Sequence, residues 1–81
     1  MATLKSYMDG KELRFGVRVG RKTNKGFATM DAALRAGIEM AQIEDPRVYG
    51  LLQGKPFDRQ VGIVFGADVR DRYLQINHSA T

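Results

Sequence analysis

The residues best suited to chemistry in this chain are cations near its N-terminus, whose charge would let them bind anions. Residues 1 to 25 hold seven of the thirteen basic residues and two of the nine acidic ones, a net charge of +5. The rest of the chain has a net charge of −1, which gives the total of +4. Cations that alternate along a strand stand about 6 to 7 Å apart, a spacing that can follow a phosphate backbone. The candidate nucleic-acid-binding residues are Lys5, Tyr7, Arg14, Arg18, Arg21, Lys22 and Lys25, among which Tyr7 offers a stacking surface.

These charges also have a plainer explanation. The solvated face of a strand often carries Lys and Arg, which protect a sheet edge against aggregation. Gly16, between Arg14 and Arg18, would let a bulky partner approach the strand closely. Both interpretations, an anion-binding surface and a merely solvated one, therefore stay open at the level of the sequence.

Few residues in the chain are suited to catalysis or to metal binding. The chain has no cysteine, and its single histidine, His78, lies three residues from the end of the sequence. A thiolate nucleophile, a thiolate metal site and a histidine-based general base are therefore not expected. The glycines of VGRKTNKG and VGIVFGAD lack the spacing of a dinucleotide or phosphate-binding loop. We expect a protein that is not an enzyme and has no cofactor and no bound metal.

Length and composition are typical of one folded domain. The 81 residues are 43% hydrophobic and 27% charged, which is ordinary for a globular protein. No apolar run approaches the roughly 18 residues that a membrane-spanning helix needs, and the N-terminal residues lack the apolar core of a signal peptide. The sequence predicts a single domain over residues 1–81 with a frayed tail at 78–81, no membrane association and a cytoplasmic location.

The cations are expected on a β-hairpin. Residues 4–8 and 11–19 flank Asp9-Gly10, a dipeptide typical of two-residue hairpin loops. Leu13, Phe15, Val17 and Val19 alternate with polar residues or glycine, so one face of the second strand should be buried. A loop at Asp9-Gly10 sets Leu4 opposite Phe15, and it sets Lys5 opposite Arg14. Like charges directly opposite each other are destabilising, unless an anion binds between them.

The longest helical pattern runs from Thr29 to Ile43. Its apolar residues recur at the spacing of one helix face, and Thr29 is a suitable N-cap. Gly37 lies on this apolar face and costs about 1 kcal/mol of helix propensity, which predicts a close approach of the helix to the sheet. Residues 20–26 before the helix are predicted to form a loop, with a short third strand at 27–28.

The second half of the chain is predicted to hold one short helix and a second hairpin. Asp45-Pro46 starts the helix, which runs to about Gln53. Alternation of Val61, Ile63 and Phe65 predicts a strand, and a second strand follows at residues 72–77. The fold class is α+β: a small two-layer sandwich with an antiparallel or mixed sheet, element order β-β-(β)-α-α-β-β, and one main helix packed on one face.

Part of this pattern resembles a known family. The run RFGVRVGRKTNKGFATMDAAL, within residues 11–43, resembles the arm-binding domains of phage integrases in having cation-bearing strands followed by a helix. The resemblance implies a three-stranded sheet that lies in a DNA groove. The predicted C-terminal hairpin departs from that family, and no residue role is carried over.

Charge and fold together favour a small nucleic-acid-binding module that contacts the DNA or RNA backbone through its basic N-terminal hairpin. The alternative is a small phage-type inhibitor or modulator that binds a larger host protein complex. Tyr49, Leu51 and Leu52 are candidate protein contacts, although packing in the core is the plainer explanation of these side chains. Positive charge suits an acidic protein groove as well as a nucleic acid. A homodimer formed through a sheet edge or the 61–65 strand is a third alternative.

Overall fold

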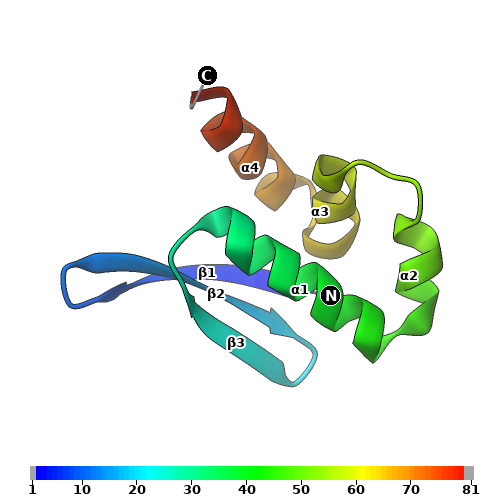
Figure 1. Cartoon of the computed structure of the whole chain (residues 1–81), viewed down its shortest axis with the longest axis horizontal. Helices are drawn as coiled ribbons and strands as arrows, with labels where there is room; N and C mark the ends of the chain where they lie inside the picture. The colour runs from blue at the N-terminus through cyan, green and yellow to red at the C-terminus, as the bar shows by residue number, and fades with distance from the viewer. Residues whose placement is uncertain (1, 80–81) are drawn as a thin grey trace.

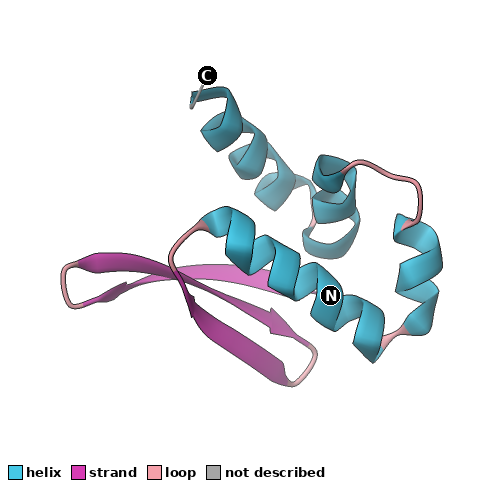
Figure 2. Ribbon diagram, viewed as in Figure 1, coloured by secondary structure: helices cyan, strands magenta, loops and turns pink. Residues whose placement is uncertain are grey.

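The computed structural model describes residues 2–79 and arranges them as a three-stranded sheet followed by four helices (Figure 1). The strands β1 (Ala2–Asp9), β2 (Glu12–Val19) and β3 (Lys22–Phe27) form an antiparallel sheet with β2 in the centre. The helices are α1 (Met30–Glu44), α2 (Pro46–Leu52), α3 (Phe57–Phe65) and α4 (Ala67–Ser79). Figure 2 shows the strands joined in one sheet, with α1 crossing in front of it, and this combination of a sheet with helices confirms the predicted α+β class.

Helix α1 forms as its apolar period predicts. The Thr29 hydroxyl accepts a hydrogen bond from the Ala32 amide at 3.2 Å, which satisfies a free N–H group at the start of the helix. The buried side of α1 consists of Met30, Ala33, Leu34, Gly37, Ile38 and Ala41. This side packs on the face of the sheet that carries Val17 and Val19, which we call the inner face. The opposite side of the sheet is the outer face.

The first hairpin has the predicted faces but a different register. Asp9 pairs with Glu12, so the two loop residues are Gly10 and Lys11 rather than Asp9 and Gly10. Glycine accepts φ of 64° at the first loop position without strain, whereas the predicted loop would place Asp9 there. Each residue of β1 therefore pairs two positions further along β2 than predicted, a shift that leaves every side chain on its predicted face.

The predicted pairings are wrong as a result of this shift. Leu4 faces Val17 instead of Phe15, and Lys5 faces Gly16 instead of Arg14. The expected opposition of two cations is absent from this hairpin, and Lys5 lies beside a residue with no side chain. The pairing of Lys5 with Gly16 shapes the candidate site described below.

The predicted C-terminal strands are also wrong, because both segments are helical. Val61, Val64 and Phe65 are buried at helical spacing in α3, whereas Ile63, which the alternating pattern placed with Val61, is 43% exposed. Helix α4 spans the residues predicted as a turn and a strand, and Tyr73 packs edge-to-face against Phe57 with ring centroids 5.3 Å apart. The short apolar pattern at 61–65 is compatible with the period of a strand and with that of a helix. The segment is helical because this places Val61, Val64 and Phe65 together in the core.

Helix α2 begins where Asp45 and Pro46 predict. The Asp45 carboxylate accepts a hydrogen bond from the Arg47 amide at 3.1 Å, and Leu52 is buried while Leu51 remains 57% exposed. Gly37 does allow a close approach, but to α3 rather than to the sheet. A Cβ atom added at Gly37 would lie 2.4 Å from Cζ of Phe65.

Two further expectations concern the termini and the membrane. Helix α4 extends through Ser79, so two residues of the predicted frayed tail are helical, and residues 80 and 81 lie outside the described part of the chain. Within residues 2–79, none of the helices combines the length and the apolar character needed to cross a bilayer.

Candidate nucleic-acid interface

The outer face of the sheet gathers most of the predicted site residues into rows that cross the strands. One row consists of Thr3, Arg18 and Thr23, the next of Lys5, Gly16 and Lys25, and the third begins with Tyr7 and Arg14. The first two rows contain three exposed cations, Lys5, Arg18 and Lys25. They are exposed because α1 packs on the other side of the sheet. The sheet therefore presents positive charge from three adjacent strands on one uncovered surface.

A bulge in β3 lets Lys25 and Phe27 lie on opposite faces of the sheet. Gly16 pairs with Lys25 and the neighbouring Phe15 pairs with Phe27, so Gly26 is an extra residue between them. In a regular strand residues 25 and 27 would share a face. The extra glycine turns Phe27 inward, where it packs against the core, while Lys25 stays on the outer face.

Replacing Gly26 with alanine is expected to lower the free energy of unfolding by about 1 to 2 kcal/mol. Its φ of 94° lies in a region that side chains with a Cβ rarely adopt, although nothing lies within 4 Å of the added atom. Urea denaturation of the variant measures this loss. Gly50→Ala, in an exposed helical position with equally free surroundings, is the control and should be stabilising by about 0.5 to 1 kcal/mol. Equal stability of Gly26→Ala and wild type would show that the bulge does not need this conformation.

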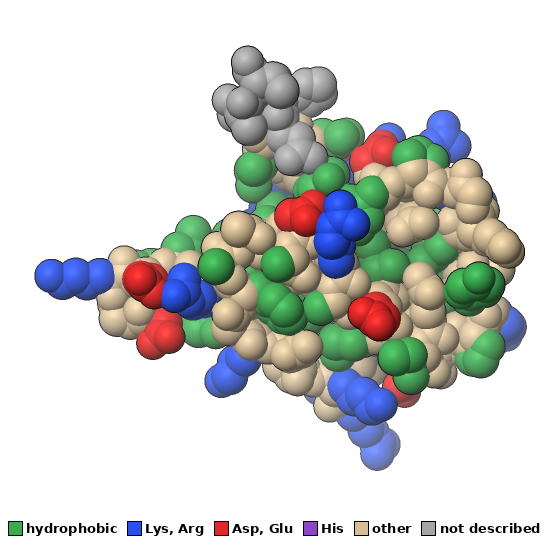
Figure 3. Space-filling view, viewed as in Figure 1, with side chains coloured by type: hydrophobic (Ala, Val, Ile, Leu, Met, Phe, Trp, Pro, Cys, Tyr) green, Lys and Arg blue, Asp and Glu red, His purple; other side chains and the backbone are tan. Residues whose placement is uncertain are grey.

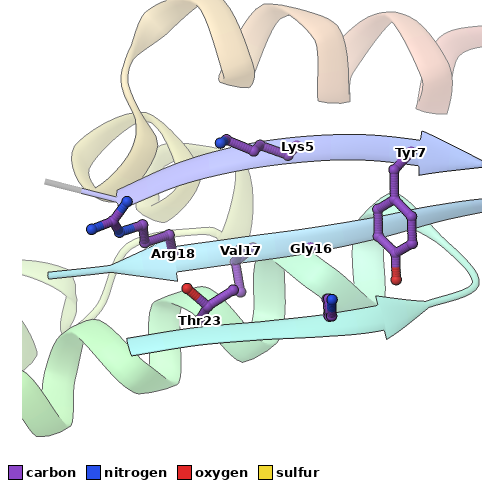
Figure 4. A pocket seen from close by; sticks show the side chains of 7 residues that line it. Lys5, Tyr7, Gly16, Val17, Arg18 and Thr23 are labelled. Atoms are coloured by element: carbon purple, nitrogen blue, oxygen red, sulfur yellow. The ribbon is translucent and has the colours of Figure 1, made fainter. Parts of the chain in front are cut away.

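The rows enclose a shallow hollow of about 170 Å³ centred on Gly16 (Figure 4). The hollow is lined by Lys5, Tyr7, Gly16, Val17, Arg18, Thr23 and Lys25. Figure 4 shows the Tyr7 ring lying across β2 with its hydroxyl group directed toward β3, and the Arg18 side chain reaching toward β1. Lining groups thus come from all three strands, and none of the described lining residues carries a carboxylate.

The cations around the hollow are not neutralised by neighbours. Among residues 2–79, Lys5, Arg18 and Lys25 take part in no ion pair, and Arg18 uses its Nε to donate a hydrogen bond to the Gly20 carbonyl oxygen at 3.2 Å. Arg14 differs, because its guanidinium forms an ion pair with Glu12 on the same strand. Near the loop at Gly10 the charges are mixed instead, because Asp9 and Glu12 lie there beside Lys11 and Arg14.

Besides Arg14, two other predicted site residues do not line the hollow. Arg21 is in the two-residue turn between β2 and β3, and Lys22 pairs with the buried Val19, which places it on the other face of the sheet. Figure 3, which views the molecule from the α1 side, shows basic side chains projecting beyond this turn. The predicted 20–26 loop is wrong, since residues 22–27 form β3. That error is why Thr23 was missed as a lining residue.

Cations outside the sheet contrast with those around the hollow. Arg35 pairs with Asp31, Arg47 with Asp45 and Arg70 with Asp58, at distances of 2.7 to 3.1 Å. The hydrogen bonds from the Arg47 side chain and then from its backbone N–H lower the pKa of Asp45, so this carboxylate remains charged to lower pH than usual. These pairs leave the helical side of the protein closer to neutral.

A second surface feature is apolar. A groove of about 430 Å³ lies where the end of α1 meets α2, α3 and the start of β1, and its lining includes Val48, Leu51, Ile63 and Glu44. Leu51 and the nearby Tyr49 on α2 are each 57% exposed, and Ile63 is 43% exposed. Leu52 is buried in the core, as the plainer explanation of these residues expects.

Comparisons of the chain with protein-family models, with curated proteins and with solved structures find no match.

Proposed function

We propose that this protein is a small, non-enzymatic, cytoplasmic nucleic-acid-binding module that contacts the DNA or RNA backbone through the outer face of its sheet. The observation that carries the proposal is that Lys5, Arg18 and Lys25, which form no ion pair with another described residue, lie together on the outer face of three strands. Arg21 extends this surface at the β2–β3 turn. Each of these side chains can form a charge-assisted hydrogen bond to a phosphate oxygen.

The composition of the surface favours backbone contact over base reading. Lysine and arginine contacts to phosphate position a protein on nucleic acid without conveying sequence. Tyr7 is the single aromatic residue on the outer face of the described sheet, which gives little capacity for stacking successive bases. We therefore expect binding with weak sequence preference.

A salt titration tests this function. Affinity for a generic DNA duplex, measured by fluorescence anisotropy, is expected to fall about 10²- to 10³-fold between 50 and 200 mM salt. This range follows from about four to five phosphate contacts, each of which releases counterions when it forms. The same titration with RNA ranks the two nucleic acids. A flat salt response, or no binding at 50 mM salt, would remove the proposal.

The second candidate function is that of a modulator that binds a host protein complex, and the apolar groove beside Leu51 favours it. Exposed tyrosine and leucine side chains around a concave apolar surface are suited to a protein contact. Affinity capture from a nuclease-treated host lysate separates the candidates when it is repeated with Leu51→Asp. A stoichiometric partner that Leu51→Asp releases supports the modulator, and an equal result for both proteins contradicts it.

A further inference from the structure

The centre of the outer face is a place where a side chain is missing between two cations. Gly16 pairs directly with Lys5 on one side and with Lys25 on the other, so the two lysines stand two strand spacings apart, roughly 9 to 10 Å. A Cβ atom at Gly16 would lie 3.0 Å from Cβ of Lys25 and would occupy the floor of the hollow. The hollow therefore depends on glycine at this position.

The side-chain groups around this hollow are suited to an oxyanion. Lys5, Lys25 and Arg18 supply charged N–H donors, while Tyr7 and Thr23 supply hydroxyl groups that can donate to an anion oxygen. The volume of about 170 Å³ is well above the roughly 10 to 15 Å³ that a cavity needs to hold one water molecule, so there is room for a larger anion. A tetrahedral anion in the hollow would be approached by donors from three strands at once.

We propose that the hollow over Gly16 is a binding site for one phosphate group of a nucleic-acid backbone, and we call this site the seat. The seat fixes the position of the sheet along the strand, whereas Arg21 and Lys22 add general electrostatic attraction. This inference rests on the proposed function, because the phosphate is taken to be part of DNA or RNA. It adds that the cations are unequal: those lining the hollow hold a defined phosphate and the others do not.

Two lysines of the same strand give a matched test. Lys22 and Lys25 are both exposed and both on β3, but only Lys25 lines the hollow. At 50 mM salt, Lys25→Gln is expected to weaken duplex binding about tenfold, and Lys22→Gln about two- to threefold, although both remove one positive charge. Because Lys22 lies on the inner face, equal losses would overturn both the seat and the outer face as the contact surface, and would leave only salt-dependent nucleic-acid binding in place.

A substitution that keeps every charge sharpens the test. Gly16→Ala is expected to weaken binding at least fivefold, because the methyl group occupies the seat, while the control Gly50→Ala leaves affinity unchanged. Thermal denaturation checks that both variants fold. If Gly16→Ala does not fold, the comparison of Lys22→Gln with Lys25→Gln tests the seat instead. Unchanged affinity of a folded Gly16→Ala would contradict the seat.

Titration with inorganic phosphate separates this inference from the proposed function. Saturable changes in the amide NMR signals of residues 5, 16 and 25, absent at the same ionic strength of chloride, are expected. Saturation without any duplex binding would overturn the nucleic-acid function and assign the seat to a free phosphate. Weak, unsaturable changes spread over all basic residues would mean an adventitious ion only, and would overturn the seat.

Discussion

Replacing Lys5, Arg18 and Lys25 together with glutamine is expected to weaken binding to duplex DNA about 10²- to 10³-fold at 50 mM salt. Each lost phosphate contact removes the gain from counterion release, and the slope of log affinity against log salt should fall by about 0.9 per contact. Anisotropy titrations at several salt concentrations measure both quantities. The three side chains form no ion pair with other described residues, so their removal leaves no unpaired carboxylate behind.

The control for this variant removes the same charge elsewhere. Lys55, Arg59 and Arg72 lie outside the sheet, belong to the exposed class and take part in none of the ion pairs between residues 2 and 79. Their triple replacement with glutamine lowers the net charge equally and should reduce affinity by only a few fold. If both triple variants lose affinity to the same degree, total charge explains binding and the outer face has no special part in it.

The second large effect concerns the contact between α1 and α3. Gly37→Ala is expected to lower the free energy of unfolding by about 1 to 3 kcal/mol, although alanine is favoured over glycine in a helix by about 1 kcal/mol. The added Cβ would meet Cζ of Phe65, a ring that is only 6% exposed and has little room to move. Urea denaturation of the variant and the wild type gives the difference.

A double-mutant cycle identifies the cause of that loss. Phe65→Leu keeps an apolar side chain in the core but removes the atoms at the end of the ring. In this background Gly37→Ala should be neutral or should stabilise the protein by up to about 1 kcal/mol. The same destabilisation in both backgrounds would contradict the close packing of Gly37 on Phe65.

The parts of the fold that were predictable from the sequence are those set by a long, unambiguous period. Helix α1 has fifteen residues with one apolar side and a threonine cap, so its bounds and its buried residues follow from the sequence. The prediction of a strand at 61–65 was wrong, because a pattern of five residues with two glycines nearby is compatible with the period of a strand and with that of a helix. Val64, buried at 6% exposure, is explained by the helix and not by the predicted strand.

The candidate site was predictable in its residue types and strand faces, but not in its shape. Alternation along β1 and β2 is enough to place Lys5, Tyr7, Arg14 and Arg18 on the outer face. The hollow depends on the pairing of Lys5 with Gly16, and the inward position of Phe27 depends on the bulge at Gly26. Both features involve a glycine with positive φ, at Gly10 in the hairpin loop and at Gly26 in the bulge. Binary patterns of apolar and polar residues do not specify these conformations.

The most direct test of the proposed interface is a map of the residues that change when duplex DNA is added to the protein. Amide NMR signals of residues 3, 5, 16, 18, 23 and 25, which lie in the rows of the outer face, should shift or broaden most. Signals from α2 and from the apolar groove around Leu51 should change little. Changes confined to α2 and that groove, with none on the three strands, would contradict the proposal that the outer face of the sheet binds nucleic acid.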